Sequence, residues 1–209
     1  SRQGKNKNHK LNLRIQVQQM DSSGSSGVSS QERNVFVTVG TTRFDKLVAA
    51  ATSPMALEWM VSKGYTSLTI QYGTGKEPEL GDASLSSVLS KLKIQTYSFQ
   101  PSLDEDMKNA ALILSHAGAG TVMEALRLRK KLVVVINTTL MNNHQTELAG
   151  AMAERGHLYM VEYPELLNDK ATWASFQGFD PIPHQGGDPG DFPRLLDAFL
   201  GFSSNNKVD

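Results

Sequence analysis

The residues best suited to hold an anion form the loop Ser115-His116-Ala117-Gly118-Ala119-Gly120-Thr121, between a predicted strand and a predicted helix. Gly118 and Gly120 let the backbone turn tightly and approach a ligand closely. The free amides at the start of the helix, together with the helix dipole, favour a negatively charged group. A diphosphate suits this arrangement, although an ordinary turn with Thr121 as the helix cap fits the spacing equally well.

Glu124 follows Thr121 by three residues, so its carboxylate can face back toward the helix start. A carboxylate in that place can accept hydrogen bonds from two ribose hydroxyls. Charge-assisted hydrogen bonds of this kind contribute roughly 1.5–3 kcal/mol. The structural alternative is a capping box in which Thr121 and Glu124 satisfy the first amides of the helix.

Two further polar groups follow predicted strands. Gly40-Thr41-Thr42 ends the first strand and can supply amides and hydroxyls to a diphosphate. Asn143 and Gln145 lie in the segment Met141–Gln145, at the start of another predicted helix. Their amides can both donate to and accept from sugar hydroxyls. Asn142 or Asn143 could instead cap the helix, whereas Gln145 has no such role and favours the sugar interpretation.

Several other chemistries are excluded by the sequence. A dinucleotide-binding fingerprint would need a third glycine where Met123 stands. Gly75-Lys76 is not part of a phosphate-binding P-loop, because Glu77 follows the lysine and Ile70 replaces the first glycine. The chain has no Gly-x-Ser-x-Gly elbow and no cysteine, so it has neither that nucleophile nor thiolate ligands. No carboxylate pair has a clear metal-binding role, and the sequence predicts no metal and no other cofactor.

The elements that position these residues alternate between strand and helix. The uninterrupted apolar run Leu132–Ile136 is typical of a strand covered on both faces, as in a parallel sheet. The alternation predicts an α/β protein with a Rossmann-like, doubly wound, mostly parallel sheet, in which ligands bind at the carboxyl ends of the strands. The predicted strands are 35–39, 67–71, 94–99, 111–114, 132–136 and 158–161, and the predicted helices are 44–51, 103–109, 121–129 and 142–155.

Composition divides the chain into four parts. Residues 1–33, with six Lys/Arg against two acids and a Ser/Gly-rich stretch, predict a flexible extension. Residues 34–177 form the predicted domain, 178–191 a Gly/Pro-rich linker, and 192–202 an amphipathic helix that packs on the domain or binds a partner. Residues 34–209 carry fifteen Lys/Arg against nineteen acids, which argues against a nucleic-acid partner. No apolar run is long enough to cross a bilayer, so we expect a soluble, cytoplasmic protein.

Taken in order, Val37–Thr42, Phe44-Asp45, Ser115–Thr121 with Glu124-Ala125-Leu126, and Met141–Gln145 resemble one family. It is the soluble subunit of the eukaryotic UDP-N-acetylglucosamine transferase of dolichol-linked oligosaccharide synthesis. That subunit is similar to the C-terminal, donor-binding half of a GT-B enzyme of glycosyltransferase family 28, the bacterial transferase that acts on lipid-linked muramyl peptide. The resemblance runs from about Val35 to Gly201, and the motifs are specific only in combination.

The resemblance implies an inverting transfer of N-acetylglucosamine from UDP-N-acetylglucosamine to dolichyl-diphosphate-N-acetylglucosamine, at the cytosolic face of the endoplasmic reticulum. It also implies a membrane-anchored partner subunit that supplies the acceptor site, and the general base is expected to come from that subunit. His116 is the catalytic candidate of this chain, but it is expected to contact phosphate or to order the loop and not to act as the base. The donor-binding residues implied are Gly40, Thr41, Thr42, Phe99, Gln100, His116, Gly118, Ala119, Gly120, Thr121, Glu124, Asn143 and Gln145.

Two other functions remain open from the sequence. A UDP-sugar epimerase uses the same architecture but needs two such halves, and this chain is long enough for one. A UDP-sugar-binding module without activity of its own is the other, because the isolated chain would behave as one until its partner is added.

Overall fold

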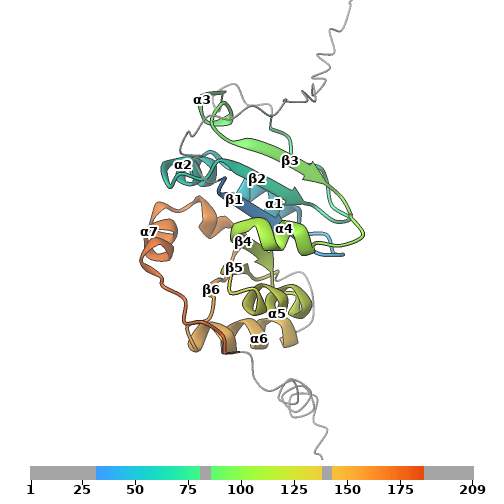
Figure 1. Cartoon of the computed structure of the whole chain (residues 1–209), viewed down its shortest axis with the longest axis vertical. Coiled ribbons are helices and arrows are strands. Elements are labelled where there is room, and N and C mark those ends of the chain that lie inside the picture. Colours follow the sequence, from blue (N-terminus) through green and yellow to red (C-terminus); the bar gives the residue numbers. More distant parts are fainter. Residues whose placement is uncertain (1–31, 81–85, 138–142, 186–209) are drawn as a thin grey trace, which may run out of the picture. The chain divides into compact units, whose positions relative to one another are not determined.

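The six strands of the protein form one parallel sheet in the order β3-β2-β1-β4-β5-β6 (Figure 1). The computed structural model describes residues 32–80, 86–137 and 143–185, with the backbone alone for 143–145. The all-parallel sheet with flanking helices confirms the predicted fold class. The strands are β1 (Asn34–Thr38), β2 (Ser67–Gln71), β3 (Lys93–Tyr97), β4 (Ala110–His116), β5 (Lys131–Val135) and β6 (Tyr159–Val161).

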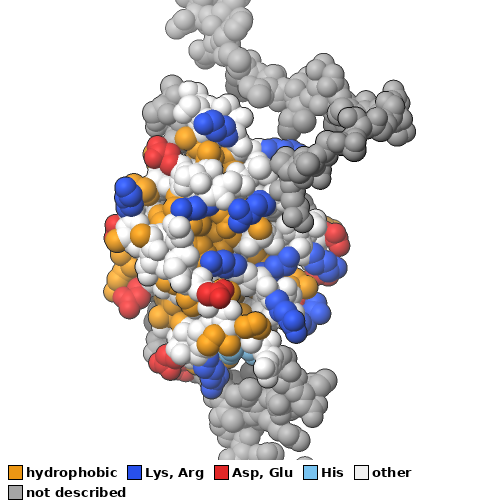
Figure 2. Space-filling view, turned by 60° about the vertical axis from the view of Figure 1, so that its left-hand side comes forward, with side chains coloured by type: hydrophobic (Ala, Val, Ile, Leu, Met, Phe, Trp, Pro, Cys, Tyr) orange, Lys and Arg blue, Asp and Glu red, His pale blue; other side chains and the backbone are white. Residues whose placement is uncertain are grey.

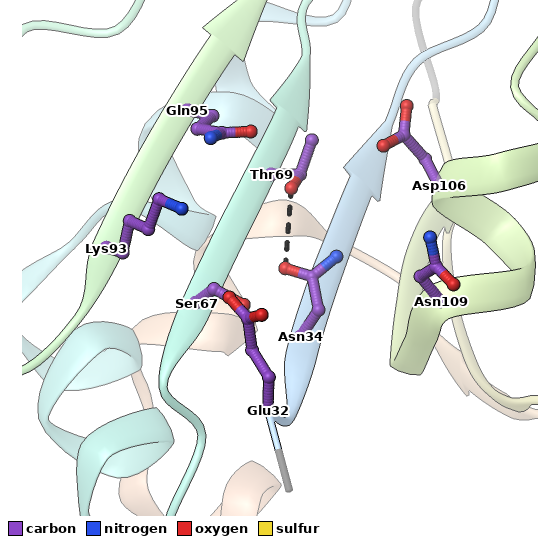
Figure 3. Close-up of a pocket in the computed structure, with 8 residues that line it drawn as sticks. All are labelled: Glu32, Asn34, Ser67, Thr69, Lys93, Gln95, Asp106 and Asn109. Carbon is purple, nitrogen blue, oxygen red and sulfur yellow. Dashed lines mark hydrogen bonds between the residues drawn. The ribbon is translucent and has the colours of Figure 1, made fainter. Parts of the chain in front are cut away.

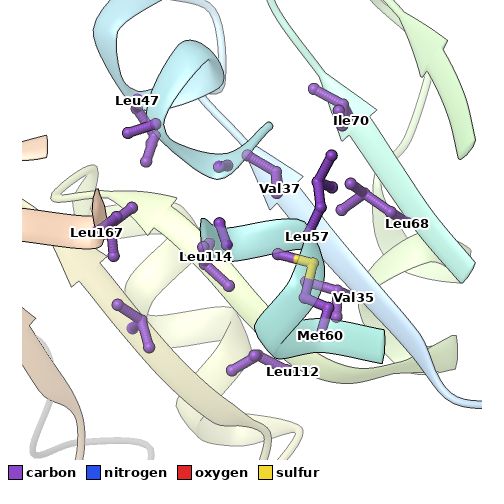
Figure 4. Packing of buried hydrophobic residues seen from close by; sticks show 14 of the residues in the cluster. Val35, Val37, Leu47, Leu57, Met60, Leu68, Ile70, Leu112, Leu114 and Leu167 are labelled. Carbon is purple, nitrogen blue, oxygen red and sulfur yellow. The ribbon is translucent and has the colours of Figure 1, made fainter. Parts of the chain in front are cut away.

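One face of the sheet is covered by α1 (Asp45–Ala51), α2 (Pro54–Ser62), η2 (Pro164–Asn168) and α7 (Lys170–Gly178). Alternate residues of the strands point into this layer, where Val35 and Val37 of β1 pack with Leu47 of α1 and Leu57 of α2 (Figure 4). These side chains are almost fully buried, so burial of apolar area is the main force that fixes the helices on the sheet.

The opposite face is covered by α4 (Asp104–Asn109), α5 (Ala119–Arg127) and α6 (Asn143–Glu154). Phe36, Ile113 and Val134 point into this second layer from β1, β4 and β5. Helices on both faces make the sheet doubly wound. The short helix α3 (Ser86–Leu89) precedes β3.

Helix α2 was missed by the sequence prediction, although its start signal is present. Ser53 accepts a hydrogen bond from the Ala56 amide, and Pro54 occupies the first helical position. A serine cap followed by proline is a common helix start, because proline has no N–H to leave unpaired. Helix α7, also missed, begins the same way with Asp169, whose carboxylate accepts from the Ala171 amide.

The predicted linker 178–191 needs correction at its start, since Gly178 is the last residue of α7. Residues 179–185 follow without regular secondary structure, and the Ile182 amide donates to the Gly156 carbonyl at 2.8 Å. This segment is therefore attached to the domain. The remainder of the linker, the predicted helix 192–202 and most of the extension 1–33 lie outside the described residues.

No helix in the described ranges is both long and apolar enough to cross a membrane.

Candidate functional site

Strands β1 and β4 are neighbours in the sheet, with Thr38 opposite Ser115. They mark the position where the strand order reverses, because β2 and β3 lie on one side and β5 and β6 on the other. Parallel α/β sheets bind ligands at the carboxyl ends of strands at such a reversal. The structure therefore places Gly40–Thr42, after β1, beside the loop at Gly118, after β4.

The imidazole of His116 lies between these two loops. A Cβ at Gly118 would overlap the ring, at 2.6 Å from Cε1, and a Cβ at Gly40 would lie 2.9 Å from the same atom. Gly40 also has a φ of +61°, which side-chain-bearing residues rarely adopt. The ring is 5% exposed and sets the distance between the loops, which explains why both flanking residues are glycines.

Burial lowers the pKa of His116, against a smaller opposing contribution from the Thr38 backbone. Its Nδ1 is buried, and among the described residues it has no hydrogen-bond partner. The imidazole is therefore neutral near pH 7, and the ring is enclosed. Its position beside both loops suits the loop-ordering role expected for His116. The alternative contact with phosphate, and the expectation that His116 is not the general base, stay predictions.

The lowered pKa of His116 predicts a pH dependence of stability. Below its ordinary pKa of 6.5 the unfolded chain binds a proton that the folded chain does not, so the unfolding free energy falls as pH decreases. Substitution His116→Asn removes this contribution. Urea unfolding at pH 7.5 and 5.5 measures the unfolding free energy of both proteins. Between these two pH values the variant should lose less of it than wild type does. Equal losses would contradict the lowered pKa of His116. Burial also lowers the pKa of His184. His184 is present in both proteins, so it contributes equally to the pH dependence of each.

Helix α5 begins two residues earlier than predicted. Its N-cap is Gly118, no side chain caps it, and Ala119 and Gly120 form the first turn. Thr121 is therefore not the cap, and the capping-box alternative is wrong. Ala119 and Gly120 are exposed, so the first amides of α5 face solvent beside Gly40–Thr42.

The Glu124 carboxylate forms an ion pair with Arg127, three residues further along α5. Arg127 Nε lies 2.8 Å from Oε2, and Nη2 lies 2.5 Å from Oε1. Hydrogen bonding to Arg127 lowers the pKa of Glu124, so the carboxylate is ionised. The Glu124 side chain was expected to turn back toward the helix start. It does not, because the Arg127 guanidinium, one turn further along the helix, binds both of its carboxylate oxygens.

Gln71, the last residue of β2, was missed by the sequence analysis. Its Nε2 donates to the carbonyls of Gly40 at 2.7 Å and Ser98 at 2.8 Å, and its Oε1 accepts from the Thr38 hydroxyl at 2.6 Å. The side chain is 1% exposed. It joins the loop after β1 to the turn after β3. A polar residue at the carboxyl end of an otherwise apolar strand was the available signal.

The turn expected to contact uracil, Phe99-Gln100-Pro101-Ser102, follows β3 at the same edge of the sheet. Phe99 is 51% exposed, and Ser102 accepts a hydrogen bond from the Asp104 amide at the start of α4. The turn is thus held at one end by Gln71 through Ser98 and at the other by Ser102, which leaves the Phe99 ring and the Gln100 backbone accessible.

Helix α6 begins at Asn143, after β5, so the backbone of Asn143 and Gln145 also belongs to the carboxyl edge. Their side chains, expected to contact the sugar, lie outside the described part of the structure, as does Asn142. The adjacent small cleft of about 200 Å³ is lined by Arg43–Lys46 and Asn137.

A larger cleft, of about 410 Å³, lies elsewhere on the sheet (Figure 3). Side chains of β2 and β3 and Asn34 of β1 line it, and Asp106 and Asn109 of α4 form one side. Thr69 donates to Asn34 across its floor. None of its lining residues comes from the loops after β1 or β4, so it is not part of the candidate site.

The face of the protein drawn in Figure 2 carries charges of both signs. In the view of Figure 2, Lys and Arg side chains are interspersed with hydrophobic and acidic ones. Lys46 and Glu165 form one exposed ion pair, at 3.1 Å. The absence of a nucleic-acid partner stays a prediction.

Comparison with known proteins extends these observations. The UDP-N-acetylglucosamine transferase subunit ALG13 of Homo sapiens is 46% identical over 128 residues, which cover 60% of this chain and 11% of the relative. The chain thus spans about a tenth of that protein. An NMR structure of ALG13 has a TM-score of 0.55 at 25% identity, covering 79% of this chain and 96% of the other.

MurG from Acinetobacter baumannii shares the fold, with a TM-score of 0.55 at 19% identity, over 83% of this chain and 51% of MurG. The family model for the glycosyltransferase family 28 C-terminal domain matches residues 34–173. This range contains the loops after β1 and β4, the turn after β3 and the start of α6. The chain therefore belongs to the glycosyltransferase family 28 C-terminal domain family.

Proposed function

We propose that this chain binds UDP-N-acetylglucosamine at the carboxyl edge of its sheet and serves as the donor-binding subunit of a transferase. The observation that carries the proposal is the pairing of two loops across the His116 ring, beside the uncapped start of α5. Exposed helix amides favour a diphosphate, and about 0.3–1 kcal/mol comes from the helix dipole alone. The proposal requires no metal ion or other cofactor, because these amides supply the positive potential.

The remaining donor contacts are distributed over the same edge. The turn Phe99–Ser102 would receive the uracil, Glu124 the ribose hydroxyls, and Asn143 and Gln145 the sugar. The subunit names of the relatives support this substrate, since they are called UDP-N-acetylglucosamine transferase subunits.

We further propose that the acceptor is dolichyl-diphosphate-N-acetylglucosamine, as in the second step of lipid-linked oligosaccharide synthesis for N-glycosylation. The general base and the acceptor site would come from a membrane-anchored partner subunit that recruits this chain to the cytosolic face of the endoplasmic reticulum. Enclosure of His116 supports this division, because the described chain offers no accessible histidine beside the loops. Transfer assays with and without the partner test it, and activity of this chain alone would refute it.

A UDP-sugar-binding module without activity is the second candidate, favoured by the same observation on His116. It predicts donor binding with no transfer even when the partner subunit is present.

Substitution Glu124→Ala tests the donor site directly. We expect UDP binding to weaken by roughly 1.5–3 kcal/mol, because the ribose hydroxyls lose a charged acceptor. Isothermal titration with UDP gives the affinity, and thermal unfolding checks the fold. Glu105→Ala, on the exposed side of α4, is the matched control and should bind as wild type does. Unchanged affinity in the Glu124 variant would leave that residue with only a helix-surface ion pair.

A further inference from the structure

Arg127 contacts the carboxylate that we assign to the ribose, and it belongs to no motif found in the sequence. Two of its nitrogens bind the two oxygens of Glu124 separately, Nε to Oε2 and Nη2 to Oε1. A single hydrogen bond would leave the carboxylate free to rotate. Two parallel bonds from a planar guanidinium fix its plane.

The carboxylate keeps acceptor capacity after this pairing. An ionised carboxylate has about four lone-pair positions, and the arginine fork uses two of them, one on each oxygen. Each oxygen can therefore still accept one hydrogen bond. The 2′- and 3′-hydroxyls of a ribose are two neighbouring hydrogen-bond donors, one for each carboxylate oxygen.

Glu124 and Arg127 differ in how far their side chains are exposed, and we take the more exposed Arg127 as the residue that positions Glu124. The Glu124 side chain is 27% exposed, whereas that of Arg127 is 68% exposed. Exposed ion pairs three residues apart on a helix contribute little to stability. Loss of Arg127 should therefore leave the fold intact and change mainly the orientation of the carboxylate.

Charged groups of α4 act on the same pair. The pKa of Arg127 is raised by its hydrogen bonds and charge interaction with Glu124, and further by the charge of Asp104. The pKa of Glu124 is lowered chiefly by Arg127, with a smaller contribution from Lys108. Asp104 is the first residue of α4, just after the turn Phe99–Ser102. Arg127 thus interacts with the element that leads from the proposed uracil turn as well as with the ribose acceptor.

We propose that Arg127 is a positioning residue: it holds the Glu124 carboxylate away from the helix start, in the orientation in which the carboxylate receives the ribose hydroxyls. It would thereby set a preference for ribonucleotide over 2′-deoxyribonucleotide donors. The inference rests on the proposed donor site. It goes beyond that site in assigning the selectivity to the geometry of an arginine fork.

Binding of UDP and 2′-deoxy-UDP to the whole chain tests the proposal. Wild type should prefer UDP, and Arg127→Ala should weaken UDP binding about five- to tenfold with little change for 2′-deoxy-UDP. Arg127→Lys retains the charge but not the fork, so it should resemble the alanine variant. Arg129→Ala removes the same charge from an exposed arginine two residues away and should retain the wild-type ratio of affinities.

The possible results separate the two proposals. If wild type binds neither nucleotide, the donor site itself is refuted. If Glu124→Ala abolishes the preference and Arg127→Ala retains it, the donor site stands and the role of Arg127 is refuted. Tighter UDP binding by Arg127→Ala would also refute it, because Arg127 would then compete with the ribose. Wild-type selectivity in Arg127→Lys would show that charge alone suffices.

Discussion

Substitution Gly118→Ala is expected to abolish measurable UDP binding and to lower the unfolding free energy by about 1–3 kcal/mol, the usual cost of overpacking. The new methyl group would overlap the His116 ring, which has 5% exposure and no open space into which it could withdraw. Movement of the ring away from residue 118 is opposed by Gly40 on its other side. The strain therefore passes to both loops that form the proposed diphosphate site.

Gly120→Ala is the control for this substitution. The same methyl group two residues later meets no atom within 4 Å, and the site lies in the first turn of α5. Its unfolding free energy should equal or exceed that of wild type, because alanine favours a helix more than glycine does. Urea unfolding and UDP titration of both variants give the comparison. Equal stability of the two variants would contradict the position assigned to the His116 ring.

Substitution Gln71→Leu is expected to cost about 3–9 kcal/mol of unfolding free energy, at about 1–3 kcal/mol for each of three buried polar groups left unpaired. The groups concerned are the Thr38 hydroxyl and the carbonyls of Gly40 and Ser98. Leucine fills a similar volume, so a cavity contributes little. UDP binding should weaken as well, because the loop after β1 and the turn after β3 would no longer be held together.

Gln95→Leu on β3 is the matched control for Gln71→Leu. Gln95 lies on the same face of the sheet but is exposed in the polar cleft (Figure 3). Its substitution should change the unfolding free energy by no more than about 0.5 kcal/mol. Urea unfolding of both variants provides the measurement. A small effect of Gln71→Leu would mean that solvent replaces the lost hydrogen bonds at this edge.

The strands, and the loops that follow β1 and β4, were the parts of the protein most accessible to prediction from the sequence. An uninterrupted apolar run such as Leu132–Ile136 has few alternatives to a doubly covered strand, and β5 occupies Lys131–Val135. The boundaries of α5 were less accessible, because two glycines and a threonine allow several helix starts. Helix α2 was predictable in principle from Ser53 and Pro54, and it was overlooked because its apolar residues lack a clear periodicity.

The sequence by itself determined the parallel α/β architecture and the collection of glycines, Glu124 and the polar turns at the carboxyl ends of the strands. These features depend on local patterns of residue type, which a linear reading contains. Only the tertiary structure decided that His116 lies between Gly40 and Gly118, that Gln71 joins two loops, and that Glu124 pairs with Arg127. The first two depend on which strands become neighbours, and the third depends on a choice between competing partners. All three contacts form only in the folded protein, so no pattern of residue types along the chain predicts them.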